Sequence, residues 1–150
     1  MPTVMQGTAI VDAGLEMTVE GTTMRNTVGP TDFYGPWVIV MVLVVNYSDK
    51  PAYFNPMIQE LLVNGDEFEP NPAVAESLDS ETVSSASLLP GGAASVVLAF
   101  SIGKDAMAFT KQAGRLVVRG NLDSRGTTVE LNGASRMCTA RRSKQCDAST

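Results

Sequence analysis

An unbroken run of nine apolar residues, WVIVMVLVV, extends from Trp37 to Val45 and restricts the folds open to this chain. Six of the nine are Val or Ile, whose β-branched side chains favour a strand over a helix. Pro36 precedes the run and the turn-rich NYSDKP follows it, as is typical of strand boundaries. Nine residues are also too few for a membrane-spanning helix, which needs about 20. The run therefore predicts a buried central strand.

Side chains alternate between the two faces of a strand, and both the odd-numbered and the even-numbered residues of this run are apolar. We therefore expect both faces of the strand to be covered. A second apolar run, ASVVLAFSI at residues 94–102, is its natural partner. The predicted core residues from these runs and from a later strand are Trp37, Ile39, Met41, Leu43, Val97, Ala99, Phe100, Leu116 and Val118.

Shorter segments between the two runs predict further strands and turns. LEMTVE at residues 15–20 alternates apolar and polar side chains and predicts a half-buried strand, and residues 21–36 predict a long connection to the central strand. Asn64-Gly65 supplies the two positive-φ residues of a type I′ turn and predicts a hairpin. Residues 103–114 have the composition of a short helix, and the segment after them predicts a closing hairpin.

Together these segments make seven or eight short strands with turn residues between them. We expect an all-β fold, an antiparallel immunoglobulin-like β-sandwich of about 7–8 strands. The two apolar runs are predicted to be central strands, one in each sheet. We predict one domain over residues 1–132, followed by a basic, flexible tail at 133–150 that carries both cysteines.

The absence of histidine excludes most hydrolase chemistry. With no His in the sequence, Ser-His-Asp and Cys-His arrangements and histidine-ligated zinc are ruled out. The glycines do not form a phosphate-binding loop of the P-loop or dinucleotide type. We predict no catalytic residue, no cofactor and no enzymatic activity.

An acidic segment follows the predicted hairpin. Its six carboxylates are Asp66, Glu67, Glu69, Glu76, Asp79 and Glu81. Calcium prefers oxygen ligands, but the segment lacks the order of acidic and Gly residues of a calcium-binding loop. We therefore expect a solvated acidic surface that takes part in interactions, and no metal site.

The formal charge of −5 argues against nucleic-acid binding by the surface as a whole. Residues 1–103 contain 12 acids and two bases, and residues 104–150 contain four acids and nine bases, which gives −10 and +5. These charges either cancel within one compact fold or support head-to-tail contacts between copies.

The first 13 residues lack the basic and apolar regions of a secretory signal peptide. We expect a chain that is either an already trimmed mature form or one that was never exported, without a membrane span. Asn46-Tyr47-Ser48 fits the N-glycosylation pattern, but it lies at a strand end and we interpret it as structural.

Three features in order carry a family resemblance: the valine-rich strand ending in NYSDKP, the hairpin LLVNGDEFEP, and LLPGGAASVVLAFSI. Together they resemble the telokin-like, immunoglobulin-fold domains of unknown function of secreted and envelope-anchored bacterial proteins, a group related to the mycobacterial immunoprotective extracellular protein. The resemblance spans residues 7–131. It implies a β-sandwich, export, and a role in binding or structure, and it supplies no catalytic residues.

The two cysteines, Cys138 and Cys146, lie close together in the tail. An exposed pair suits an oxidising compartment, so we predict an intramolecular disulfide, with two free thiols as the alternative. The closed loop would display Arg141, Arg142 and Lys144 to an acidic partner or to the acidic segment of another copy.

We therefore predict a non-enzymatic module, extracellular or in the cell envelope, that binds a protein partner. The alternative is a virion or surface-layer component that acts by self-assembly, for which opposed charges would provide contacts between copies.

Overall fold

The computed structural model describes residues 2–28, 33–78, 83–112 and 114–132. The strands are β1 (Thr3–Met5), β2 (Ala9–Asp12), β3 (Leu15–Val28), β4 (Phe33–Asn46), β5 (Ala52–Phe54), β6 (Glu60–Val63), β7 (Asp66–Phe68), β8 (Ala86–Leu88), β9 (Ala93–Ser101), β10 (Arg115–Val118) and β11 (Thr127–Glu130). The helices are α1 (Pro72–Glu76) and α2 (Ala106–Gln112), and the short 3-10 helices are η1 (Pro56–Ile58) and η2 (Gly103–Asp105).

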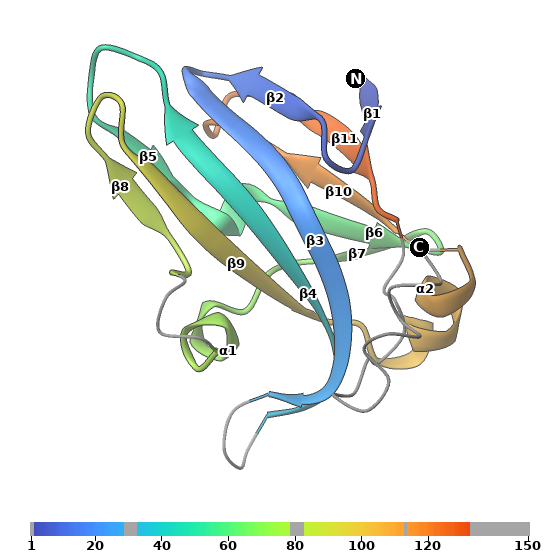
Figure 1. Ribbon diagram of the computed structural model, residues 1–150. Helices are drawn as coiled ribbons and strands as arrows, with labels where there is room; N and C mark the ends of the chain where they lie inside the picture. Colours follow the sequence, from blue (N-terminus) through green and yellow to red (C-terminus); the bar gives the residue numbers. More distant parts are fainter. Residues whose placement is uncertain (1, 29–32, 79–82, 113, 133–150) are drawn as a thin grey trace.

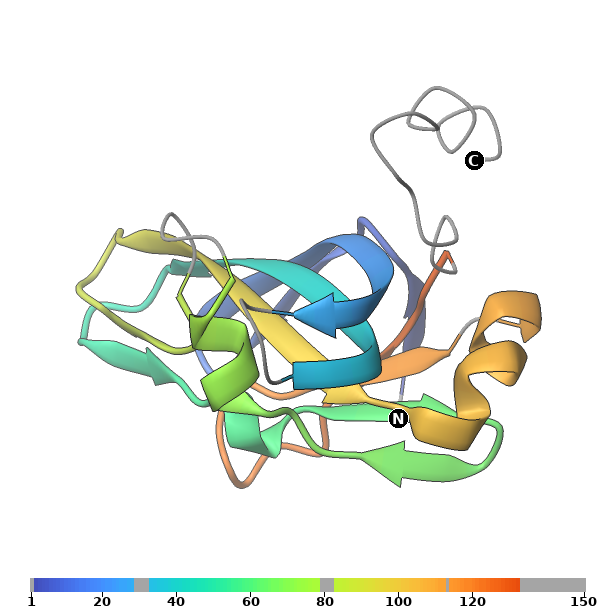
Figure 2. The same cartoon turned by 90° about the horizontal axis from the view of Figure 1, so that it is seen from below.

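The strands form a sandwich of two main sheets, as the sequence predicts (Figure 1). One sheet has the order β1-β11-β10-β6-β7 and the other β2-β3-β4-β9, and β5 pairs with β8 beside them. Figure 2 shows the two sheets as stacked layers. All pairs of strands are antiparallel except β1 and β11, which run parallel. The structure contains more strands than the seven or eight expected, because several short segments of three or four residues form strands of their own.

The nine-residue apolar run lies within β4, which is a central strand between β3 and β9. Its even-numbered valines point into the space between the sheets and are buried there: Val38, Val40, Val42 and Val44. They pack against residues of the facing sheet such as Leu61 of β6 and Leu116 of β10. This interface is the main core.

The second apolar run forms β9, but it does not occupy the other sheet. It pairs directly with β4, from Trp37 opposite Ser101 to Val45 opposite Ala93. The prediction of a direct partnership is confirmed, whereas the prediction that each sheet holds one of the two runs is wrong. The facing sheet needs no such run, because short strands each contribute one or two buried residues, such as Leu61, Leu116 and Val129.

Helix α1 explains why β4 and β9 are apolar on both faces. It lies on the outer face of the four-stranded sheet and covers a second buried cluster of Trp37, Ile39, Val74, Ala75, Val97 and Ala99. The Asn71 side chain accepts a hydrogen bond from Val74 N at the start of the helix, and Asn71 N–H donates to Ala99 O of β9 at 2.8 Å. The short helix is thereby fixed to the sheet.

The outer face is covered over only part of its length. Met41 and Leu43, which we predicted as core residues, are only partly buried: Met41 packs against the edge of the cluster under α1, and Leu43 lies beyond that cluster. The other predicted core residues are buried. The expectation that the whole outer face of the central strand is covered is therefore wrong for its second half.

Residues 21–36 are not a long connection. β3 continues to Val28 and pairs with β4 from Leu15 opposite Asn46 to Val28 opposite Phe33. A register shift between Val19 and Gly21 moves the inward-facing side chains from odd to even positions. That shift interrupts the alternation that would have revealed the strand.

Three local predictions are confirmed. Asn64 and Gly65 have φ angles of 51° and 85° and connect β6 to β7, β10 and β11 form the closing hairpin, and residues 103–112 form η2 and α2. Among the described residues, the helices are all too short and polar to cross a bilayer.

Candidate functional site

The acidic segment does not converge on one place. Asp66 and Glu67 lie on β7, at the edge of the five-stranded sheet, whereas Glu76 ends α1 on the outer face of the other sheet. Glu69 is exposed just after β7, and Asp79 and Glu81 lie outside the described residues. Within the described ranges, no group of three or more acidic residues is placed to hold a metal ion.

The tail residues predicted for the disulfide and the basic loop lie outside the described part of the chain. They are Cys138, Arg141, Arg142, Lys144 and Cys146. The disulfide and the basic interaction surface therefore stay predictions.

One member of the acidic segment meets a carboxylate that the sequence did not indicate. Asp105, at the end of η2, is buried and contacts Asp66 at the start of β7. A hydrogen bond with Asp66, burial, and the negative charge of Asp66 raise the pKa of Asp105, against the opposing effects of Lys104 and Asn64.

The loops at one end of the sandwich are held together by Asn46. Its buried side chain donates from Nδ2 to Lys50 O at 2.8 Å and to Leu88 O at 3.0 Å, and Oδ1 accepts from Ser48 N and Ser48 Oγ. Its backbone bonds to the turn before β9, at Gly91 and Gly92. Because both atoms of the amide are engaged inside the fold, Asn46 is a structural residue.

Two more loops join this end. Tyr47 N–H donates to Gly14 O in the β2–β3 turn. Asp12 of β2 accepts from Gly120 N at 2.7 Å and from Ser124 Oγ at 3.0 Å, both in the β10–β11 loop. A side chain at Gly120 would overlap with the Asp12 carbonyl, so the close approach of these loops requires glycine. Figure 1 shows the loops at the same end of the sandwich.

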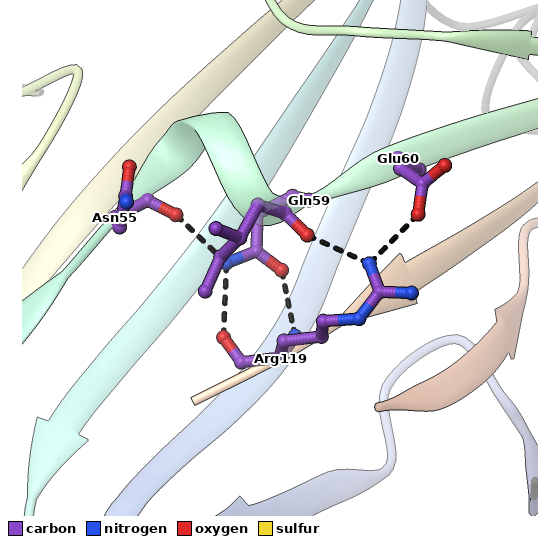
Figure 3. Close-up of polar contacts among 5 residues, drawn as sticks. Asn55, Gln59, Glu60 and Arg119 are labelled. Carbon is purple, nitrogen blue, oxygen red and sulfur yellow. Dashed lines mark hydrogen bonds and ion pairs between the residues drawn. The ribbon is translucent and has the colours of Figure 1, made fainter. Parts of the chain in front are cut away.

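A third buried polar network lies at the start of β6. Gln59 donates from Nε2 to Asn55 O and Arg119 O, and its Oε1 accepts from Arg119 N (Figure 3). The Arg119 guanidinium in turn donates to Ile58 O and forms an ion pair with Glu60 at 2.8 Å. Both polar atoms of the buried Gln59 amide are engaged within the chain, so Gln59 is a structural residue.

The uncovered half of the outer face is built from two cross-strand rows, which we call the open face. The rows are Val11, Glu16, Val45 and Ala93, and Ala9, Thr18, Leu43 and Ser95, from β2, β3, β4 and β9 in that order. All eight residues are at least partly exposed, and Glu16 is the one charged member. In the part of the chain that the structure describes, a largely apolar surface on this half of the sheet is therefore left partly exposed to solvent.

Exposed apolar side chains extend the open face toward the loops. Val11 is 67% exposed, Tyr47 directly after β4 is 66% exposed, and Leu89 in the β8–β9 turn is 72% exposed. Clustered apolar side chains of this kind, on a surface with polar surroundings, mark interaction sites. The open face and the neighbouring loop tips are therefore the candidate functional site, and the chemistry they offer is contact with an apolar partner surface.

Residues 6–118 match the model of a domain of unknown function, DUF4352. The chain belongs to this family. A comparison with curated proteins gave no significant match.

The solved structures that resemble this DUF4352 domain share its fold at low sequence identity. The yjhA protein from Bacillus subtilis aligns with 88% of this chain over 100% of its own, at 14% identity and a TM-score of 0.63. An uncharacterised β-sandwich protein from Clostridium difficile aligns with 86% of this chain over 93% of its own, at 10% identity and a TM-score of 0.52. A "putative lipoprotein" from Bacillus subtilis, ycdA, aligns with 84% of this chain but only 38% of its own, at 12% identity and a TM-score of 0.56.

The open face and Asp105 of this DUF4352 domain were not predicted from its sequence. A pattern that could have indicated the open face is Asn71-Pro72, an N-cap followed by Pro at the first helical position, which predicts a helix able to cover one part of the sheet. Asp105 meets Asp66 only through the fold, and the sequence contains no local pattern that links them.

Proposed function

We propose that this domain is a non-enzymatic module that binds a protein partner through the open face. The observation that supports this proposal is the partly exposed half of the outer sheet surface, where Leu43 and Val45 of β4 and the exposed Val11 of β2 lie on either side of β3. α1 covers the outer face of β4 and β9 at their other half. A partner segment placed on the open face would continue that layer.

The rigidity of the surroundings favours binding by a preformed surface. The backbone beneath the open face belongs to four hydrogen-bonded strands, and Asn46 and Asp12 tie the adjoining loops together. A surface that is already ordered loses little conformational entropy on binding. A surface that combines apolar and polar side chains, with an exposed aromatic residue such as Tyr47 at its margin, is typical of sites that bind proteins.

We propose that the protein acts outside the cell or in the cell envelope. The fold neighbour described as a "putative lipoprotein" supports such a location, as does the resemblance to telokin-like, immunoglobulin-fold domains of secreted bacterial proteins. Fractionation of the source cells tests it: we expect the protein in the envelope or medium, and recovery in the cytosol alone would contradict this location.

Site-specific crosslinking tests the binding proposal. A photoreactive phenylalanine analogue at Val11 should give one protein adduct in the source cells. The same analogue at Met107, an equally exposed apolar residue on α2, is the matched control. The adduct is then identified by mass spectrometry and the complex reconstituted from purified proteins.

In the reconstituted complex, Leu43→Asp should weaken affinity by at least about tenfold, because it places a charge in the centre of the contact. Its fold is checked by circular dichroism. Adducts of equal yield at Val11 and Met107, or an affinity that Leu43→Asp leaves unchanged, would contradict binding at the open face.

Self-assembly is a second candidate function, supported by the separation of charge along the sequence, −10 over residues 1–103 and +5 over residues 104–150. The four-stranded sheet carries Asp12, Glu16, Glu20 and a single base, Arg25. Lys104, Lys111 and Arg115 lie on η2, α2 and β10. Contacts between these regions of two copies would weaken with salt. Light scattering after gel filtration distinguishes the two: oligomers that dissociate with added salt support assembly, and a monomer at low and high salt supports the binding module.

A further inference from the structure

Asp66 and Asp105 come together at a depression between the β6–β7 hairpin and η2. Asp66 follows the Asn64-Gly65 turn, and Asp105 ends η2 just before α2. Both carboxylates line a depression of about 410 Å³, together with Glu67, Phe68, Ser101, Ile102, Gly103 and Lys104. Two segments far apart in sequence thus place acidic groups at one position.

One oxygen of the buried Asp105 carboxylate lacks a hydrogen-bond partner within the described part of the chain. The residue is only 4% exposed, and its Oδ2 atom is buried without a hydrogen-bond partner among the described residues. An unpaired charge in such a position costs free energy unless a positive group compensates it. Lys104 is the adjacent residue, but it forms no ion pair with any described residue. The described residues therefore provide no ion pair that would compensate a negative charge on Asp105.

We propose that Asp66 and Asp105 bind a calcium ion, which neutralises both carboxylates. Calcium takes six to eight oxygen ligands in flexible geometry and accepts carboxylates, amide oxygens, backbone carbonyls and water together. Asn64 also contacts Asp105 and can turn its amide oxygen toward the ion. At neutral pH a divalent ion neutralises two carboxylates at once, whereas a proton neutralises only one.

The site should be weak and should have a structural effect. It has two carboxylates and a nearby positive charge at Lys104, so we expect a dissociation constant of about 10⁻⁴–10⁻³ M, the range of extracellular calcium modules. The ion would fasten the β6–β7 hairpin to η2 and α2. This inference is independent of the open face, which lies on the other sheet.

Calcium titration of the full chain tests the site. After treatment with EDTA, 10 mM CaCl2 should raise the melting temperature by about 3–10 °C, because the ion binds only the folded state. Backbone amide resonances of residues 64–66 and 103–105 should shift with the same dissociation constant. KCl at equal ionic strength controls for screening, and MgCl2 should give a smaller effect because magnesium keeps more of its water.

Substitutions locate the effect. Asp105→Asn and Asp66→Asn should each abolish the calcium-dependent rise, whereas Asp49→Asn, at an exposed carboxylate in the β4–β5 loop, should retain it. In EDTA, the melting temperature of Asp105→Asn should be no lower than that of the wild type, because the substitution removes a buried charge. If Asp105→Asn does not fold, Asp66→Asn, at a less buried residue, still tests whether the calcium effect is lost. Absence of a calcium effect on the wild type, or a calcium-dependent rise in the two Asn variants as large as that of the wild type, would overturn the proposal.

Discussion

The side chain of Gln59 completes the hydrogen bonds of the Arg119 backbone. Arg119 N–H donates to Gln59 Oε1 at 2.7 Å, and Gln59 Nε2 donates to Arg119 O at 2.9 Å. The backbone ladder between β6 and β10 ends at Glu60 opposite Val117. Two residues later, at Arg119, the side-chain amide of Gln59 makes the hydrogen bonds that a peptide group of a neighbouring strand would make. The same Nε2 also donates to Asn55 O at 2.9 Å, which fixes η1 to the end of the ladder.

We expect Gln59→Ala to lower the free energy of unfolding by about 2–4 kcal/mol, because it leaves the Arg119 peptide and Asn55 O without these partners. Urea unfolding followed by circular dichroism measures the loss. Gln112→Ala, at an exposed position at the end of α2, should change stability by less than about 0.5 kcal/mol. Equal stability of the two variants would show that the network is not stabilising.

Asn46 provides a second test of a buried amide. Asn46→Asp should destabilise the fold by about 2–4 kcal/mol, because a carboxylate oxygen would face the carbonyls of Lys50 and Leu88 in place of the donating Nδ2. The matched control is Asn26→Asp, at an exposed residue of β3, which should be nearly neutral. Thermal unfolding of both variants measures the difference, and a melting temperature unchanged by Asn46→Asp would contradict the role of Asn46 at the loop end.

Val42 and Leu43 are neighbours in β4 but point to different environments. Val42 is fully buried between the sheets, and Leu43 is partly exposed on the open face. Val42→Ala should cost about 2–3 kcal/mol, and Leu43→Ala should cost less despite removing a larger side chain. Urea midpoints compare them directly. A larger loss for Leu43→Ala would mean that the open face is covered and is therefore not a binding surface.

The sequence predicted those parts of the fold that depend on local patterns. The apolar run of β4 and the Asn64-Gly65 turn were found because strand burial and positive φ angles restrict the residue types at those positions. β3 was cut short because the register shift after Val19 breaks its alternation. The sheet assignment of β9 failed because an apolar run shows that a strand is buried, but not which strands lie beside it.

The candidate sites were harder to predict because they arise from what the fold brings together or leaves uncovered. The sequence predicted Leu43 as a core residue, but it lies beyond the cluster under α1 and stays partly exposed. Asp66 was found as part of an acidic segment, but its partner Asp105 comes from a distant turn. Long-range proximity of this kind has no local pattern.

The pairing of Cys138 and Cys146 is the last prediction. In protein purified from its own compartment without reductant, the intact mass should be lower by two hydrogens than the mass after reduction. In the chain-entropy model, closing so short a loop lowers the conformational entropy of the unfolded segment and so stabilises its folded form by about 2–3 kcal/mol. This effect is local, because both cysteines come after the last strand of the sandwich in the sequence. Cys138→Ser should therefore abolish the mass difference and leave the urea midpoint of the sandwich unchanged. Two free thiols in the native material would contradict the disulfide and weaken the proposal of an extracellular or envelope location, because an exposed pair of thiols is typical of a reducing compartment.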